Sequence, residues 1–194
     1  VVRPRPATER ELRSFHTIEY ISAVKSLSQG SQGVDPGKYN FSLTGDNPYF
    51  SGMYESALIS TGGSIVGAEL LCEGIVNRAF NIGGGLHHAA ADRASGFCVF
   101  NDLVIAINHF LDRGMRVAYI DIDCHHGDGV QNAYYSSDQV LTISIHESGK
   151  YLFPGTGFPD ENGVGSGKGY SVNIPLFPFT DDETYLRLFR ELII

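Results

Sequence analysis

Cysteines, long apolar runs and positive charges are all scarce in this sequence of 194 residues. Its three cysteines, Cys72, Cys98 and Cys124, are too few and too widely spaced for a disulfide framework or a Cys-x-x-Cys metal site. We therefore expect a reducing compartment, the cytoplasm or, in a eukaryote, the nucleus. No apolar run approaches the roughly 18 residues of a membrane span, and no charged-then-apolar leader opens the chain. We expect neither a membrane span nor a secretory signal.

Acidic residues outnumber basic ones by 22 to 14, which gives a formal net charge of −8. This balance argues against broad binding to nucleic-acid backbones and is compatible with a cationic substrate. Hydrophobic residues make up 42% and charged residues 19% of the chain, values typical of a globular core. No linker or repeat divides the sequence, and the helical pattern at its end has no stop signal. We therefore expect residues 1–194 to be one partial domain of a longer protein.

Helical and strand patterns alternate along the second half of the sequence. A helical pattern over 97–111 ends at Gly114 and leads into the β-branched run 116–123. The other expected elements are helices over 8–28, 51–76 and 129–135, a helix capped by Asp181 or Asp182, and strands over 78–82, 140–145 and 170–174. Such alternation predicts an α/β fold, with a mainly parallel sheet and helices on both of its faces.

The polar run Asp121-Ile-Asp-Cys-His-His-Gly-Asp-Gly129 follows the most apolar of these strands. Ligands of open α/β sheets bind beyond the carboxyl ends of the strands, so this run is a candidate site. Strand alternation would place Asp121, Asp123 and His125 on one side and Cys124 on the other. Carboxylates and imidazoles are suitable ligands for Zn²⁺ or Fe²⁺. Helix capping is the alternative, but it would use at most one carboxylate, so metal binding is the favoured interpretation.

A second candidate site is the run Gly83-Gly-Gly-Leu-His-His-Ala89. Glycines let the backbone approach a ligand closely, and two adjacent histidines can act as a proton-transfer pair. A single histidine would more often be a core residue, whereas a pair after a glycine-rich turn favours catalysis. We expect Cys98 and Cys124 to be small buried apolar residues rather than metal ligands.

Five motifs in a fixed order resemble the signature of the metal-dependent histone deacetylase superfamily, which includes the bacterial and archaeal acetoin-utilization proteins. They are Gly84-Gly-Leu-His-His-Ala89, Ser95-Gly-Phe-Cys98, Asn101-Asp102, Asp121-Ile-Asp-Cys-His-His-Gly-Asp-Gly129 and Phe153-Pro-Gly-Thr-Gly157. The resemblance spans nearly the whole chain. It implies an arginase-like α/β fold and a zinc-dependent hydrolase that removes acetyl or other acyl groups from lysine side chains or related amines.

The resemblance also implies a role for each matching residue. The implied catalytic residues are His87, His88, Asp121 and Asp128, and the implied metal ligands are Asp123 and His125. The two histidines would activate water and shuttle protons. Asp121 would orient His87, and Asp128 would orient His88. The metal would be Zn²⁺, with Fe²⁺ as the alternative.

Further residues match the family's substrate channel and its structural potassium site. Phe97 and Phe153 would form the walls of a narrow acyl-lysine channel beside the Gly96 carbonyl, and Asp46 would hold the substrate backbone at its rim. Core packing is the alternative for both phenylalanines, although Phe153 is expected on a loop. The implied potassium ligands are Ser144 and Ile145 together with the carbonyls of Asp121, Asp123 and His125.

Some features of the family have no counterpart in these residues. The third metal ligand, an aspartate, and the tyrosine that stabilises the oxyanion come from the family's C-terminal half. The N-terminal strand and its arginine are missing as well. We therefore expect this chain alone to be a poor or inactive catalyst, and the complete protein to be the enzyme. The substrate is left open among a histone tail, another acetylated protein, an acetylpolyamine and a small metabolic amide.

Two other functions compete with this interpretation. An apolar strand that ends in Asp-x-Asp is also typical of aspartate-nucleophile phosphatases, in which Asp121 would attack phosphorus and Asp123 would act as the acid. That motif normally lies near the N-terminus and continues with Thr or Val, whereas Cys124 follows here. The second alternative is a non-catalytic family member that only binds acyl-lysine or a partner.

Overall fold

A computed structural model describes residues 1–194, which form two compact units, Val1–Met115 and Arg116–Ile194. The expectation of one partial domain stays a prediction. The chain has no helix with the length and apolar character that crossing a membrane requires.

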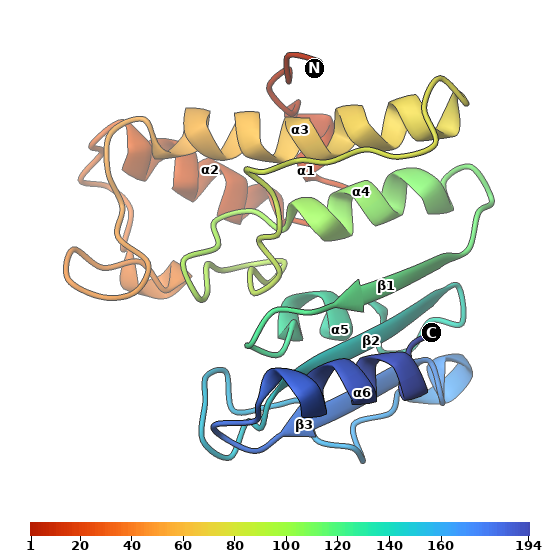
Figure 1. Cartoon of the computed structure of the whole chain (residues 1–194). Coiled ribbons are helices and arrows are strands. Elements are labelled where there is room, and N and C mark those ends of the chain that lie inside the picture. The colour runs from red at the N-terminus through yellow and green to blue at the C-terminus, as the bar shows by residue number, and fades with distance from the viewer. The chain divides into compact units, whose positions relative to one another are not determined.

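The first unit is built from helices and loops. Its elements are α1 (Glu9–Leu12), α2 (Ile18–Ser28), η1 (Gly37–Tyr39), α3 (Met53–Cys72) and α4 (Asp102–Leu111). Helix α3 packs against α2 and α4, as the ribbon shows (Figure 1). The predicted capping box begins α1: Glu11 N donates to Thr8 Oγ1 at 3.3 Å, and Thr8 N donates to Glu11 Oε2 at 2.7 Å. The helix predicted from residue 97 begins only at Asp102, because the Asn101 side chain caps it by accepting a hydrogen bond from Val104 N.

Aromatic side chains from several helices and loops form the core of this unit. Tyr20, Phe41 and Phe100 are fully buried there. The Tyr20 hydroxyl donates to the Val99 carbonyl at 2.7 Å, so its polar atom is satisfied within the core. Burying each such ring stabilises the fold by roughly 1.5–3 kcal/mol.

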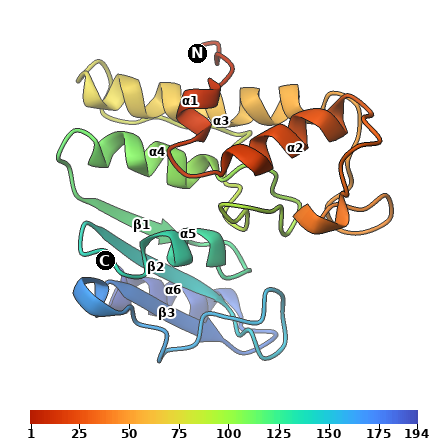
Figure 2. The ribbon, with the colours of Figure 1, turned by 180° about the vertical axis from the view of Figure 1, so that it is seen from behind.

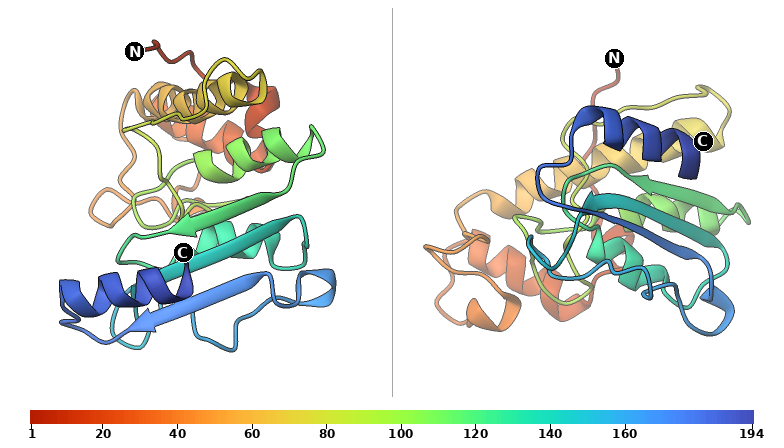
Figure 3. Two further views of the ribbon diagram at one scale, coloured as in Figure 1. Left: turned by 45° about the vertical axis from the view of Figure 1, so that its right-hand side comes forward. Right: turned by 60° about the horizontal axis from the view of Figure 1, so that its bottom comes forward.

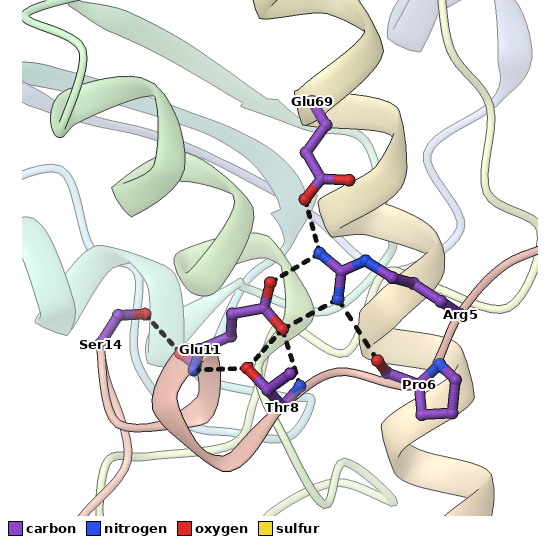
Figure 4. Close-up of polar contacts among 6 residues, drawn as sticks. All are labelled: Arg5, Pro6, Thr8, Glu11, Ser14 and Glu69. Atoms are coloured by element: carbon purple, nitrogen blue, oxygen red, sulfur yellow. Dashed lines mark hydrogen bonds and ion pairs between the residues drawn. The ribbon is translucent and has the colours of Figure 1, made fainter.

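The N-terminal segment crosses α3 at Gly62, where a side chain would collide with the Arg5 carbonyl. Arg5 itself forms an ion-pair cluster there, with Nη2 at 2.7 Å from Glu11 Oε1 and at 2.5 Å from Glu69 Oε1 (Figure 4). Burial opposes the ionisation of Glu11, but the Arg5 guanidinium and hydrogen bonds from Thr8 outweigh it and hold the pKa of Glu11 at about 2.

The second unit is a parallel α/β layer. Its elements are β1 (Val117–Asp121), α5 (Asp128–Tyr134), β2 (Val140–Glu147), η2 (Gly165–Gly167), β3 (Ser171–Leu176) and α6 (Asp182–Leu192). The three strands are parallel in the order β1-β2-β3, and α5 and α6 lie on opposite faces of the sheet (Figures 2 and 3). Asp181 caps α6 by accepting a hydrogen bond from Thr184 N. This unit confirms the predicted α/β fold with a parallel sheet and helices on both faces.

The strand predicted over 78–82 is wrong. These residues lie in an unpaired stretch, with Phe80 and Ile82 exposed by 89% and 90%. A strand forms when its backbone N–H and C=O groups make hydrogen bonds to those of a neighbouring strand. All three strands of the sheet belong to the second unit, and residues 78–82 pair with none of them. The side chain of Asn81 instead ties the stretch to α3, donating to Ser60 O and Ser64 Oγ at 2.9 Å each.

Candidate functional site

The first candidate site lies at the carboxyl end of β1. This strand ends at Asp121, whose side chain is buried. Its Oδ1 accepts a hydrogen bond from Asp123 N at 3.0 Å, and its Oδ2 accepts one from the Tyr119 hydroxyl at 2.5 Å. Asp121 is therefore fixed in place, and it begins the bend that follows the strand.

Three consecutive side chains with metal-binding atoms gather at this bend. Asp123 Oδ1 lies 2.9 Å from His125 Nδ1 and also accepts a hydrogen bond from His125 N at 2.8 Å. Cys124 Sγ lies 3.3 Å from the same Nδ1. One ligand atom of each residue lies within 4.8 Å of the others. Oxygen, nitrogen and sulfur donors in such proximity fit a divalent metal ion such as Zn²⁺.

The expectations for Cys124 are wrong on two points. Its side chain is exposed rather than buried, and its sulfur lies beside His125 rather than on the opposite side. Alternation fails here because the strand has already ended and residues 123–125 bend. Partial burial raises the pKa of the Cys124 thiol, and the negative charge of Asp123 raises it further. Cys98 is buried, as expected.

The loop Phe153–Gly157 lies next to the bend that follows β1. The rings of Phe153 and His125 are 6.2 Å apart and meet edge to face. Two buried histidines hold the loop: His126 Nδ1 is 2.8 Å from Thr156 Oγ1, and His146 Nε2 is 3.0 Å from Gly157 O. Phe153 is 44% exposed on this loop, so the core-packing alternative is wrong for it.

Burial lowers the pKa of both loop-holding imidazoles, His126 and His146. His146 Nδ1 also lies 2.8 Å from Ser144 Oγ. Ser144 is paired in register with Asp121, and both it and Ile145 are buried. The structure thus places two of the predicted potassium ligands, Asp121 and Ser144, on adjacent strands, while the ion itself stays a prediction.

The second candidate site is the glycine-rich loop of the first unit. His87 and His88 are both buried, with ring centroids 4.0 Å apart. The Asp102 carboxylate shapes the loop before them, accepting hydrogen bonds from Leu86 N at 2.8 Å and Gly85 N at 3.1 Å. The backbone of this loop is therefore anchored to the start of α4.

Two residues that support this loop had no role assigned from the sequence. Asn101 Nδ2 donates to the carbonyls of His87 at 3.3 Å and Ala89 at 3.0 Å. Burial raises the pKa of Asp102, although hydrogen bonds from Ser64 and from the loop backbone favour its charged form. Adjacent polar residues before an apolar helix indicate a helix start, and that pattern could have drawn attention to this pair.

The predicted substrate-binding residues of the first unit lie close together at its surface. Phe97 has a φ of 67° and is 74% exposed, so the core-packing alternative is wrong for it as well. Its N–H donates to Asn47 Oδ1 at 2.9 Å, which links it to the loop that carries the exposed Asp46. A hollow of about 300 Å³ is lined mainly by apolar residues, among them Phe97 and Leu86, and by a few polar ones that include Asn47.

The predicted site residues therefore fall into two groups. The first unit holds Asp46, His87, His88, Gly96 and Phe97, and the second holds Asp121, Asp123, His125, Asp128, Ser144, Ile145 and Phe153. Asp128 is the first residue of α5. The pairing of Asp121 with His87 and of Asp128 with His88 stays a prediction.

Comparisons with known proteins agree with the resemblance. The family described as the histone deacetylase domain matches residues 1–194. The acetoin utilization protein AcuC of Bacillus subtilis is 47% identical over 191 residues, which cover 98% of this chain and 49% of the relative. Histone deacetylase RPD3 of Saccharomyces cerevisiae is 45% identical over 194 residues, which cover all of this chain and 45% of the relative.

A solved structure has the same fold. The crystal structure of an HDAC homologue from Aquifex aeolicus matches with a TM-score of 0.89 and 38% identity, over 98% of this chain and 54% of that one. The chain thus spans about half the length of the relatives that it matches. Because the family's domain matches residues 1–194 and relatives at these identities align with nearly all of them, the chain belongs to the histone deacetylase family.

Proposed function

We propose that this chain carries metal-binding and proton-transferring residues of a deacetylase. Its reaction would be hydrolysis of the amide in an acetylated lysine side chain or a related acetylated amine. The observation that carries the proposal is the approach of Asp123 Oδ1 to His125 Nδ1, 2.9 Å apart at the carboxyl end of β1, in a chain of this family. Parallel sheets bind their ligands at that end.

Asp123 and His125 would hold a divalent ion, Zn²⁺ or Fe²⁺. Such an ion, when bound, lowers the pKa of a water molecule and polarises the acyl oxygen of the substrate. A structural potassium ion is proposed as well, near the same bend. Its ligands would be Ser144, Ile145 and the carbonyls of Asp121, Asp123 and His125.

His87 and His88 would move the protons of the reaction. Hydrolysis adds a hydroxyl group to the acyl carbon, breaks the carbon–nitrogen bond and places a proton on the leaving amine. One imidazole would take a proton from water, and the pair would return one to the nitrogen. Asp102 and Asn101 support this role because they fix the loop backbone around both histidines. Asp121 and Asp128 would orient the two rings.

Phe97 and Phe153 would contact the apolar stem of the acylated side chain. Both rings are exposed. A hydrogen bond from Phe97 N to Asn47 Oδ1 fixes the backbone at Phe97, and the contact between His126 and Thr156 fixes the loop that carries Phe153. The Gly96 carbonyl would lie beside the stem, and Asp46 would bind the substrate backbone. The net charge of −8 favours a cationic carrier such as a lysine-rich peptide.

We further propose that the 194-residue chain alone hydrolyses its substrate poorly. Relatives are about twice as long, and the third family ligand and the oxyanion-stabilising tyrosine are expected in the part that this chain does not span. The loss of one oxyanion donor typically lowers turnover by about 10²- to 10³-fold.

The test compares this chain with a polypeptide of the relatives' length that contains it. We expect the longer protein to bind about one Zn²⁺ or Fe²⁺ per chain and to release acetate from an acetyl-lysine peptide. His125→Ala and Asp123→Asn should remove both the metal and the activity. Asp138→Asn changes an exposed aspartate of the same unit and should leave both unchanged.

Two outcomes would contradict the proposal in different ways. A longer protein that binds acetyl-lysine peptides without hydrolysing them would instead be the non-catalytic binding member. Enzyme-like turnover by the 194-residue chain itself would refute the proposed dependence on the missing half. Membership of the histone deacetylase family leaves the phosphatase alternative without support.

A further inference from the structure

His16 is a buried histidine in the turn between α1 and α2, outside the residues of both candidate sites. It is 3% exposed, and its ring centroid lies 4.8–5.5 Å from those of Phe15, Tyr20 and Phe100. Burial lowers the pKa of His16 to about 4, so the ring is neutral at pH 7. An apolar side chain would fill this space without polar atoms to satisfy, so the choice of an imidazole calls for a polar role.

Hydrogen bonds at both nitrogens of the neutral ring fix its tautomer. Asn101 N donates to Nε2 at 3.0 Å, so Nε2 carries no proton. The proton therefore lies on Nδ1, which is 3.3 Å from the Ala91 carbonyl oxygen. Thr17 N donates to the same carbonyl at 2.9 Å. The ring thus ties the backbone at residue 91 to the backbone at residue 101.

Asn101 connects this histidine with the two histidines of the glycine-rich loop. Its Nδ2 donates to the carbonyls of His87 at 3.3 Å and Ala89 at 3.0 Å. Its backbone N–H is held by His16 Nε2, so the side chain starts from a fixed point. The carbonyls of residues 87, 89 and 91 are therefore all held, the first two by Asn101 and the third by His16 and its neighbour Thr17.

We propose that His16 is a positioning residue for proton transfer, which keeps the rings of His87 and His88 in place by holding the backbone of residues 87–91. The proposal rests on the proposed function, in which these two rings move the protons of the reaction. Placement of this kind matters because a displacement of about 1 Å can lower the rate of an enzyme by about 10²-fold. A neutral imidazole suits the role, since it joins a backbone N–H to a backbone carbonyl without placing a charge in the core.

The test replaces His16 in the longer protein that contains this chain. His16→Leu fills the space but removes both hydrogen bonds, whereas the amide of His16→Gln can still accept and donate. We expect His16→Leu to lower kcat for an acetyl-lysine peptide by roughly 10- to 100-fold. KM and the bound metal should stay as in the unchanged protein, because the residues proposed to bind substrate and metal lie elsewhere. Amide hydrogen exchange over 87–91 should become faster, and His16→Gln should recover most of kcat.

His109→Leu is the matched control. His109 is a half-buried histidine of α4 in the same unit, and its Nε2 has no hydrogen-bond partner. We expect this variant to keep both kcat and the exchange over 87–91. A second measurement needs no variant: nitrogen-15 NMR of the unchanged protein at pH 7 should show His16 neutral, with its proton on Nδ1.

The outcomes separate this proposal from the proposed function. If His16 only fills the core, His16→Leu will lower kcat and metal content in the same proportion, as the folded fraction falls, and His16→Gln will not restore kcat selectively. That result, unchanged exchange over 87–91, or a His16 ring that is charged or protonated on Nε2 at pH 7 would each overturn the proposal alone. Absence of hydrolysis by the unchanged longer protein would refute the proposed function and, with it, the role of His16.

Discussion

The Arg5 cluster allows a quantitative prediction about stability. Arg5 bridges the short helix α1 and the long helix α3 through Glu11 and Glu69 (Figure 4). Glu11 also accepts hydrogen bonds from the N–H and the hydroxyl of Thr8, at 2.7 and 2.8 Å. Glu11→Gln keeps the size of the side chain but removes its charge, so it isolates the ionic part of these contacts.

The pKa of Glu11 sets the size of the effect. A pKa held at about 2, instead of the ordinary 4.5, corresponds to about 3 kcal/mol at roughly 1.4 kcal/mol per pKa unit. The side chains of Arg5 and Glu11 are 38% and 25% exposed, so solvent screens the pair. We therefore expect Glu11→Gln to lower the free energy of unfolding by about 1–2 kcal/mol at pH 7.

The sign of the pH dependence follows from the same pKa. Because folding lowers the pKa of Glu11, its stabilisation is complete above pH 4.5 and is lost as the pH falls toward about 2. Urea unfolding, followed by circular dichroism at pH 7 and pH 3, measures the difference between the unchanged protein and Glu11→Gln. Glu19→Gln, an exposed change, is the control. A loss below about 0.5 kcal/mol at pH 7, or one that does not shrink on acidification, would refute the reasoning.

Three further substitutions test the packing of the first unit and the loop next to the candidate metal site. Phe100→Ala should cost about 3–5 kcal/mol in urea unfolding, because the ring is fully buried in the first unit; a cost near 1 kcal/mol would contradict that burial. Gly62→Ala should cost about 1–3 kcal/mol, since its methyl group would collide with the Arg5 carbonyl, and an unchanged midpoint would show that the N-terminal segment does not cross there. Thr156→Val removes the contact with His126, so amide hydrogen exchange over 151–157 should become faster, while Thr180→Val should leave it unchanged.

Local signals explain why much of the fold was predictable. Thr8 and Asp181 each cap the helix that follows them, and such caps depend only on residues a few positions away. The strands over 140–147 and 171–176 are likewise marked by their own apolar, β-branched residues. These elements required no knowledge of distant contacts, and the structure confirms them.

The errors occurred where contacts distant in sequence decide the structure. Residues 78–82 have the composition of a strand, but pairing depends on a neighbour that their own sequence cannot reveal. The role of Asp102 depends on Ser64 and on the loop backbone near Gly85, contacts that span many residues. Sequence motifs identified the residues around His87, whereas only the structure showed which of them hold its loop.

The bend after β1 differs from both cases. Here hydrogen bonds between residues two positions apart override the strand alternation of the same residues. Alternation predicted Cys124 on the far side of Asp123 and His125, on the assumption that the strand continues through them. The side chains of Asp121 and Asp123 end the strand themselves by accepting the N–H groups of residues 123 and 125. The carboxylates that make the run a candidate metal site therefore also create the turn that brings the Cys124 sulfur to 3.3 Å from His125 Nδ1. Where an apolar strand runs into an Asp-x-Asp-x-His sequence, strand alternation should not be extended past the first aspartate, because the backbone there is shaped by side-chain acceptors rather than by the sheet.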